Sequence, residues 1–124
     1  MQKTLIALAA TMTVAGAAQA QEMVFTSWGG TTQDAQAAHW AAPFTEKTGT
    51  AVVQDGPTDY GKIKAMVEAG AVTWDVVDVE FDWALQAGAQ GLLEPLDFSV
   101  IDKAALDPRF VSDFAVGSFY YSFV

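Results

Sequence analysis

Aromatic and acidic side chains are concentrated in three short segments of the sequence, at 27–30, 55–60 and 78–83, each directly after a stretch that favours a β-strand. An aromatic face holds an organic ammonium ion with about 0.5–2 kcal/mol, and a carboxylate adds Coulomb attraction in a partly dry site. The three segments contain no arginine, so they favour a cationic ligand over sulfate or phosphate. We predict that the ligand is contacted by Trp28, Gly29, Tyr60, Asp78, Glu80, Phe81 and Asp82.

Several of these residues also have a purely structural interpretation. Trp28 can pack on the helix that follows it, and Gly29-Gly30 suits a tight turn at a helix start. Asp78 interrupts an apolar strand, so it is either wet near the strand end or paired inside the protein. Asp59 and Asp82 are residue types that cap helix N-termini. The sequence leaves both interpretations open for each of them.

Motifs for catalysis are absent from the sequence. It has no G-x-S-x-G, no H-E-x-x-H and no phosphate-binding G-x-x-x-x-G-K-[ST]. It has no cysteine, which excludes thiol catalysis and cysteine-bound metals. The single histidine, His39, is expected at the surface of a helix. We therefore predict a binding protein that uses no cofactor, with an exported hydrolase that uses the carboxylates as the alternative.

Strand and helix patterns alternate along the chain. Strands are expected at 23–27, 50–54 and 74–79, and helices at 31–48, 60–70 and 81–89. Pro43 should kink or restart the first helix, and Gly49 suits its C-terminal cap. A single helical turn is expected at 102–106 and a further strand at 118–124.

This order predicts an α/β fold, a mostly parallel sheet with flanking helices. Ligands of such sheets bind beyond the carboxyl ends of the strands, where helix N-termini also gather. The three segments rich in rings and acids follow three strands, so we expect them to meet along one edge of the sheet.

The first 20 residues have the layout of a secretory signal peptide: Lys3, an apolar run, and a small-x-small site at Ala18-Gln19-Ala20. The mature domain would then be 21–124. The chain has 15 acidic and 6 basic residues, a net charge of −9, which argues against nucleic acid and anionic lipid as partners. Because it ends in the aromatic stretch 118–124, we expect the sequence to be an N-terminal fragment of a longer protein.

Four stretches occur in an informative order: Trp28-Gly29-Gly30 after the first strand, and the segments 43–53, 60–77 and 91–97. In order and spacing they resemble the spermidine/putrescine group of bacterial extracellular solute-binding proteins. The resemblance implies the first part of lobe 1 of a two-lobed, type II periplasmic-binding-protein fold, with the ligand contact after the first strand at Trp28. Here the contacts after the third strand fall near Glu80 to Asp82.

The resemblance also implies a function. The protein would be a periplasmic monomer that binds spermidine, putrescine or a similar small organic cation and delivers it to the membrane permease of an ABC importer. Ferric iron and thiamine are the alternative ligands within the same class of proteins.

Overall fold

The computed structural model describes residues 21–117. The predicted leader at 1–20 and the predicted strand at 118–124 lie outside the described residues. The strands are β1 (Glu22–Thr26), β2 (Ala51–Asp55) and β3 (Val76–Val77). The α-helices are α1 (Gly30–Gln36), α2 (Ala42–Thr48), α3 (Tyr60–Glu68) and α4 (Phe81–Ala89). A π-helical turn, η1 (Ala37–Ala41), joins α1 to α2, and two 3-10 turns follow, η2 (Lys103–Ala105) and η3 (Pro108–Phe110).

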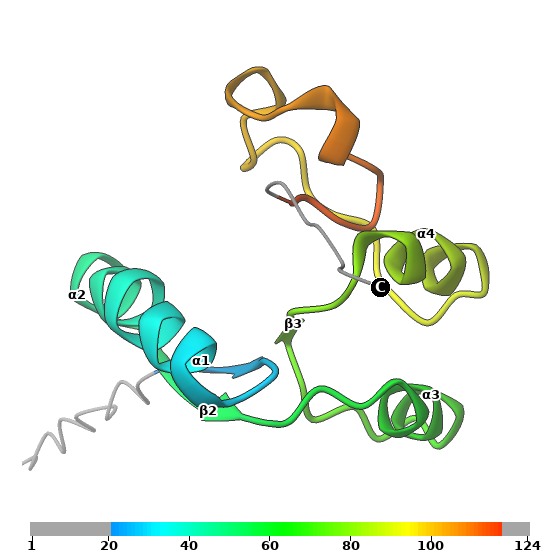
Figure 1. Cartoon of the computed structure of the whole chain (residues 1–124), viewed down its shortest axis with the longest axis horizontal. Helices are drawn as coiled ribbons and strands as arrows, with labels where there is room; N and C mark the ends of the chain where they lie inside the picture. The colour runs from blue at the N-terminus through cyan, green and yellow to red at the C-terminus, as the bar shows by residue number, and fades with distance from the viewer. Residues whose placement is uncertain (1–20, 118–124) are drawn as a thin grey trace, which may run out of the picture.

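The three strands form a parallel sheet in the order β2-β1-β3, which confirms the predicted α/β class. Figure 1 shows β3 between two pairs of helices, with α1 and α2 to its left and α3 and α4 to its right. The carboxyl ends of β1, β2 and β3 therefore point the same way, and each is followed by a turn that leads into a helix.

The third strand is shorter than the predicted 74–79. Asp75 uses its carboxylate to accept the Val24 amide of β1 at 2.8 Å, ahead of the two residues that pair as a strand. Trp74 is buried with 5% of its surface exposed. The Asp75 amide still donates to the Val24 carbonyl at 3.1 Å, but its carboxylate takes the place of a backbone acceptor, so the prediction of a six-residue strand was wrong in length although right in place.

Pro43 interrupts the first helical segment as predicted. It lies in the first turn of α2, directly after the π-helical turn η1. Proline has no amide hydrogen for an intrahelical bond, and its ring crowds the preceding turn, which accounts for the changed winding ahead of it. Gly49 ends α2 with φ 77°, the left-handed cap that the sequence indicated.

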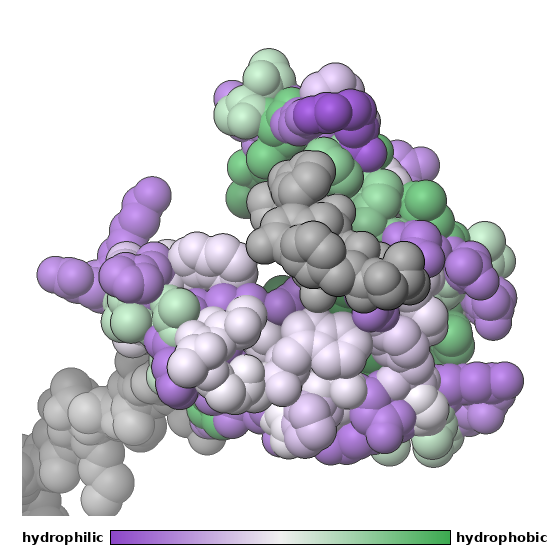
Figure 2. Space-filling view, viewed as in Figure 1, coloured by the Kyte–Doolittle hydropathy of each residue, from purple (hydrophilic) through white to green (hydrophobic). Residues whose placement is uncertain are grey.

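Few apolar side chains are buried among residues 21–117. They are Ile63 in α3, Trp74 just before β3, and Ala84 and Ala87 in α4. The segment 92–117 folds back on α4, and a Cβ on Gly88 would lie 2.3 Å from the Phe114 ring, so only glycine permits this contact. In Figure 2 the hydrophobic surface gathers over this segment, at the top of the view. Within residues 21–117 no helix has both the length and the apolar character needed to cross a bilayer.

Candidate functional site

Three aromatic rings, one after each strand, come together at the carboxyl edge of the sheet. Tyr60, the first residue of α3, stacks on Trp83 of α4 with ring centroids 4.1 Å apart and planes 7° apart. Trp28, which follows β1 closely, meets Tyr60 edge to face at 5.9 Å and 84°. Trp28 keeps 36% of its surface exposed. The structure therefore brings the three predicted turns together and leaves an open indole face beside the stacked pair.

Glu80 is attached to this aromatic cluster through the hydroxyl of Tyr60. The hydroxyl donates to Oε2 of Glu80 and accepts the Glu80 amide at 3.2 Å. Within the part of the chain that the structure describes, the Glu80 carboxylate bonds to no side chain other than Tyr60 and forms no ion pair. The Tyr60 hydroxyl is thus fully used in holding Glu80, whose half-buried negative charge stands beside the rings.

Asp78 lies just after β3 and is half-buried. Its Oδ2 atom accepts hydrogen bonds from Oγ of Ser27 at 3.1 Å and Nε2 of Gln36 at 2.8 Å. Its backbone carbonyl accepts the Thr58 hydroxyl at 2.9 Å. Of the two interpretations left open by the sequence, the geometry corresponds to the paired one.

Asp55, the last residue of β2, is held by contacts with Trp74 and Lys62. Its Oδ2 accepts the indole N–H of buried Trp74 at 2.6 Å and lies 3.6 Å from Nζ of Lys62. The Lys62 ammonium also lies 4.2 Å from the centre of the Trp74 ring. The hydrogen bond from Trp74 lowers the pKa of Asp55 below its ordinary value of 3.8, and the Gly56 amide and Lys62 act in the same direction.

This shift predicts an acid-sensitive contribution of Asp55 to folding. A carboxyl whose folded pKa is depressed stabilises the protein fully above its unfolded pKa, and this contribution is lost as the pH falls through the folded value. The free energy of unfolding should therefore decrease below about pH 3.8, and Asp55→Asn should make that decrease smaller. Urea unfolding at pH 3 and pH 6 measures it, and an identical pH dependence in the variant and the wild type would contradict it.

The remaining predicted contacts lie at the margin of the cluster. Gly29 has φ 84° and leads the chain into α1, as a turn glycine does. Phe81 packs edge to face against Phe110, on the side of the segment 92–117. Asp82 is exposed in the first turn of α4, and the N-cap of that helix is Glu80, so the capping interpretation of Asp82 was wrong. Asp59 caps α3, accepting the Lys62 amide at 2.8 Å, so its structural interpretation is the one observed.

Residues that the sequence analysis did not select also belong to this region. Ser27 is fully buried, and Gln36 and Thr58 are 6% and 7% exposed. Gly56 approaches so closely that a Cβ would lie 2.7 Å from the Ser27 carbonyl oxygen. A polar residue at the end of an apolar strand was the available signal for Ser27, but nothing in the spacing pairs a helical glutamine with a strand-end aspartate 42 residues away.

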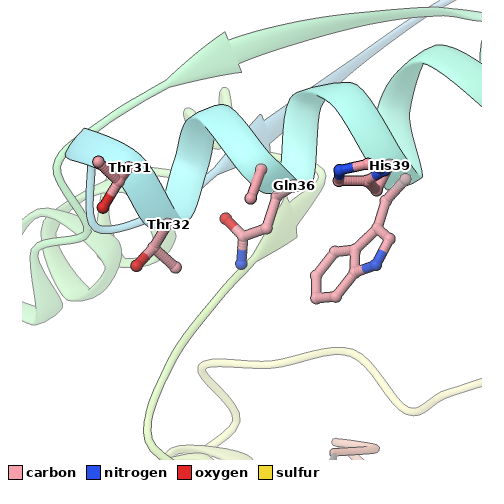
Figure 3. Close-up of a pocket in the computed structure, with 6 residues that line it drawn as sticks. Thr31, Thr32, Gln36 and His39 are labelled. Atoms are coloured by element: carbon pink, nitrogen blue, oxygen red, sulfur yellow. The ribbon is translucent and has the colours of Figure 1, made fainter.

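An open pocket of about 470 Å³ runs along α1 and η1 and is lined by Thr31, Thr32, Ala35, Gln36, His39 and Trp40. Figure 3 shows Thr32 and Gln36 projecting from the same side of the helix. Its lining includes none of Trp28, Tyr60, Trp83 and Glu80, but the amide of Gln36 donates to Asp78. Among residues 21–117 no group of three or more His, Asp or Glu side chains is arranged to hold a metal ion.

Comparison with known proteins places this geometry in context. Residues 39–122 match the family model described as bacterial extracellular solute-binding protein. A γ-aminobutyric acid (GABA)-binding protein of Pseudomonas aeruginosa is 37% identical over 112 residues, which are 89% of this chain and 32% of that protein.

Two solved structures are similar in fold and sequence. A GABA receptor structure has a TM-score of 0.79 and 73% identity, covering 83% of this chain and 32% of that one. AgtB of A. tumefaciens R10, a periplasmic binding protein (PBP) in complex with agropinic acid, has a TM-score of 0.74 and 37% identity, covering 80% and 31%. The chain thus spans about a third of the length of the relatives it matches, and its α/β fold corresponds to part of the periplasmic-binding-protein structures.

Proposed function

Because this chain belongs to the bacterial extracellular solute-binding protein family, we propose that it is the first part of a protein that captures a small solute and delivers it to the permease of an ABC importer. The match over 39–122 supports this proposal. Residues 1–20 would serve as the cleaved export signal, and the chain from 21 onward would contribute the first part of lobe 1 of a two-lobed, monomeric protein that needs no cofactor.

We propose GABA, or another small amino acid with its ammonium group distant from its carboxylate, as the solute. The observation that supports a solute with an ammonium group is the contact of Trp28, Tyr60 and Trp83 with one another and of Tyr60 with Glu80. We propose that the ammonium group contacts both the partly exposed Trp28 ring and this carboxylate, so that a cation–π contact and an ion pair act together. The names of the similar proteins, a GABA-binding protein and a GABA receptor, favour the same solute.

The carboxylate end of such a solute needs donors from elsewhere in the protein. Lys62 is the basic residue nearest to the three turns in the sequence, and its ammonium is held between Asp55 and Trp74. We therefore expect the carboxylate to be bound by residues of the second lobe. The 124 residues alone would bind the solute weakly, because one lobe cannot enclose it.

Spermidine and putrescine remain the competing solutes. The aromatic cluster and Glu80 would also accept one end of a polyamine, so this lobe by itself does not distinguish the two classes. The distinction lies at the other end of the solute, where a polyamine carries a second ammonium and GABA carries a carboxylate.

Calorimetric titration of the complete protein with GABA, putrescine and spermidine tests the proposal. We expect GABA to bind with micromolar or tighter affinity, with both polyamines at least tenfold weaker, a difference of about 1.4 kcal/mol. The chain 21–124 titrated in parallel should give no measurable heat at micromolar concentrations. Tighter binding of a polyamine would replace GABA as the solute, and no binding of any of the three would refute the proposal.

A further inference from the structure

Asp78 connects three separate parts of the chain behind the aromatic cluster. Its Oδ2 atom accepts from Ser27 at the end of β1 and from Gln36 at the end of α1, and its backbone carbonyl accepts from Thr58 in the turn after β2. Its amide donates to the Thr26 carbonyl at 2.8 Å. Every donor side chain in this set is at least nine-tenths buried.

Three of these residues lie close in the sequence to a residue of the proposed solute site. Ser27 directly precedes Trp28, Thr58 lies two residues before Tyr60, and Asp78 itself lies two residues before Glu80. The Thr58 amide also donates to the Ser27 carbonyl at 2.9 Å, which ties two of these anchors to each other. The positions of the two rings and of the carboxylate are therefore set by hydrogen bonds that converge on Asp78.

The Gln36 amide shows what Asp78 contributes. Its Nε2 donates to Asp78, and its Oε1 is buried with no hydrogen-bond partner among the described residues. If the amide were rotated by 180°, Oε1 would face the Asp78 carboxylate, and the hydrogen bond from Nε2 to Asp78 would be lost.

From this geometry we propose that Asp78 is a positioning residue of the solute site, which acts as a hydrogen-bond acceptor and does not contact the solute. The proposal rests on the proposed function for its meaning, since what is positioned is the arrangement of Trp28, Tyr60 and Glu80. In that role the negative charge of Asp78 is not required for solute binding, whereas the hydrogen bonds that Ser27 and Gln36 donate to it are required.

Two substitutions in the complete protein separate these roles. Asp78→Asn keeps an oxygen acceptor and removes the charge, so GABA affinity should stay within about twofold of wild type. Gln36→Met keeps the charge and the side-chain size but removes a donor that holds Asp78 in place, so affinity should fall about tenfold, a loss of about 1.4 kcal/mol. Thermal unfolding of both variants is measured beside the titrations, to verify that each variant is folded at the temperature at which its affinity is measured.

The opposite pattern would overturn the proposal. If Asp78→Asn bound GABA at least tenfold more weakly while Gln36→Met bound normally, Asp78 would be meeting the solute as a charge. Normal binding by both variants, or equal loss in both, would also contradict a positioning role. Neither substitution removes the carboxylate volume or opens a large cavity, so the comparison does not depend on a severely destabilised variant.

Amide hydrogen exchange of the solute-free protein tests the role of Asp78 independently of the identity of the solute. The Thr58 amide should exchange faster in Gln36→Met than in wild type, whereas Asp78→Asn should leave its exchange unchanged. This result would support the anchoring role even if GABA were not the solute. Unchanged exchange in Gln36→Met would overturn the proposal even if wild type bound GABA as expected.

Discussion

Glu80→Gln in the complete protein is expected to weaken GABA binding about 10- to 100-fold, because a hydrogen bond to a charged group contributes about 1.5–3 kcal/mol. The substitution removes the charge next to the aromatic cluster and retains an oxygen that can accept from the Tyr60 hydroxyl. The stacked pair of Tyr60 and Trp83 should therefore stay in place, and the loss should report the missing attraction to the ammonium. Calorimetric titration measures it.

Asp82→Asn is the matched control for this prediction. Asp82 is an acid two residues further on, exposed in the first turn of α4, and its side chain forms no hydrogen bond or ion pair among the described residues. Its replacement should change the affinity less than about twofold, since exposed charges interact weakly across water. Equal losses in the two variants would indicate a general effect of negative charge and would contradict a specific contact by Glu80.

Trp28→Ala is expected to lower the affinity about tenfold. The substitution removes the open indole face, for which a cation–π contact of about 0.5–2 kcal/mol is typical. It also removes the edge contact to Tyr60, the residue whose hydroxyl is hydrogen-bonded to Glu80. Trp28→Phe retains a smaller aromatic face and should recover part of the affinity, which distinguishes a ring contact from simple loss of volume.

Trp40→Ala serves as the control for Trp28. Trp40 is also an exposed tryptophan, with 63% of its surface accessible, and it lines the pocket along α1 and η1. Its replacement should leave GABA affinity unchanged. A loss as large as that of Trp28→Ala would place the solute in that pocket and would contradict a site at the aromatic cluster.

The meeting of the three turns could be predicted because it depends on topology alone. Once β1, β2 and β3 are parallel, their carboxyl ends share an edge, and whatever follows them must lie there. Trp28, Tyr60 and Glu80 were placed correctly by this argument without knowledge of any side-chain contact. Their proposed contacts with a solute stay predictions until binding is measured.

Errors arose where a side chain had a choice of partners. Asp82 matched the usual residue type of an N-cap, but α4 begins at Phe81 and Glu80 holds the capping position. The Glu80 carboxylate makes no capping bond, because it is taken by the Tyr60 hydroxyl from another helix. A pattern along one segment contains no information about such a contact.

For the same reason, the length of β3 and the hydrogen-bond partners of Asp78 could not be predicted from the sequence. Asp75 competes with the backbone for the Val24 amide and shortens the strand. Asp78 finds its donors on β1 and α1, far away along the chain. Alternation of apolar and polar residues predicts a strand and its two faces, but not which distant side chains will satisfy a polar group at its end.

The close stacking of Tyr60 on Trp83 also gives the molecule an optical property of its own. Light absorbed by the phenol passes efficiently to an indole only 4.1 Å away, and the emission of the neighbouring Trp28 depends on how much water surrounds it. A solute that binds on the Trp28 ring displaces this water. Occupancy of the cluster can therefore be followed by intrinsic fluorescence, without an attached dye.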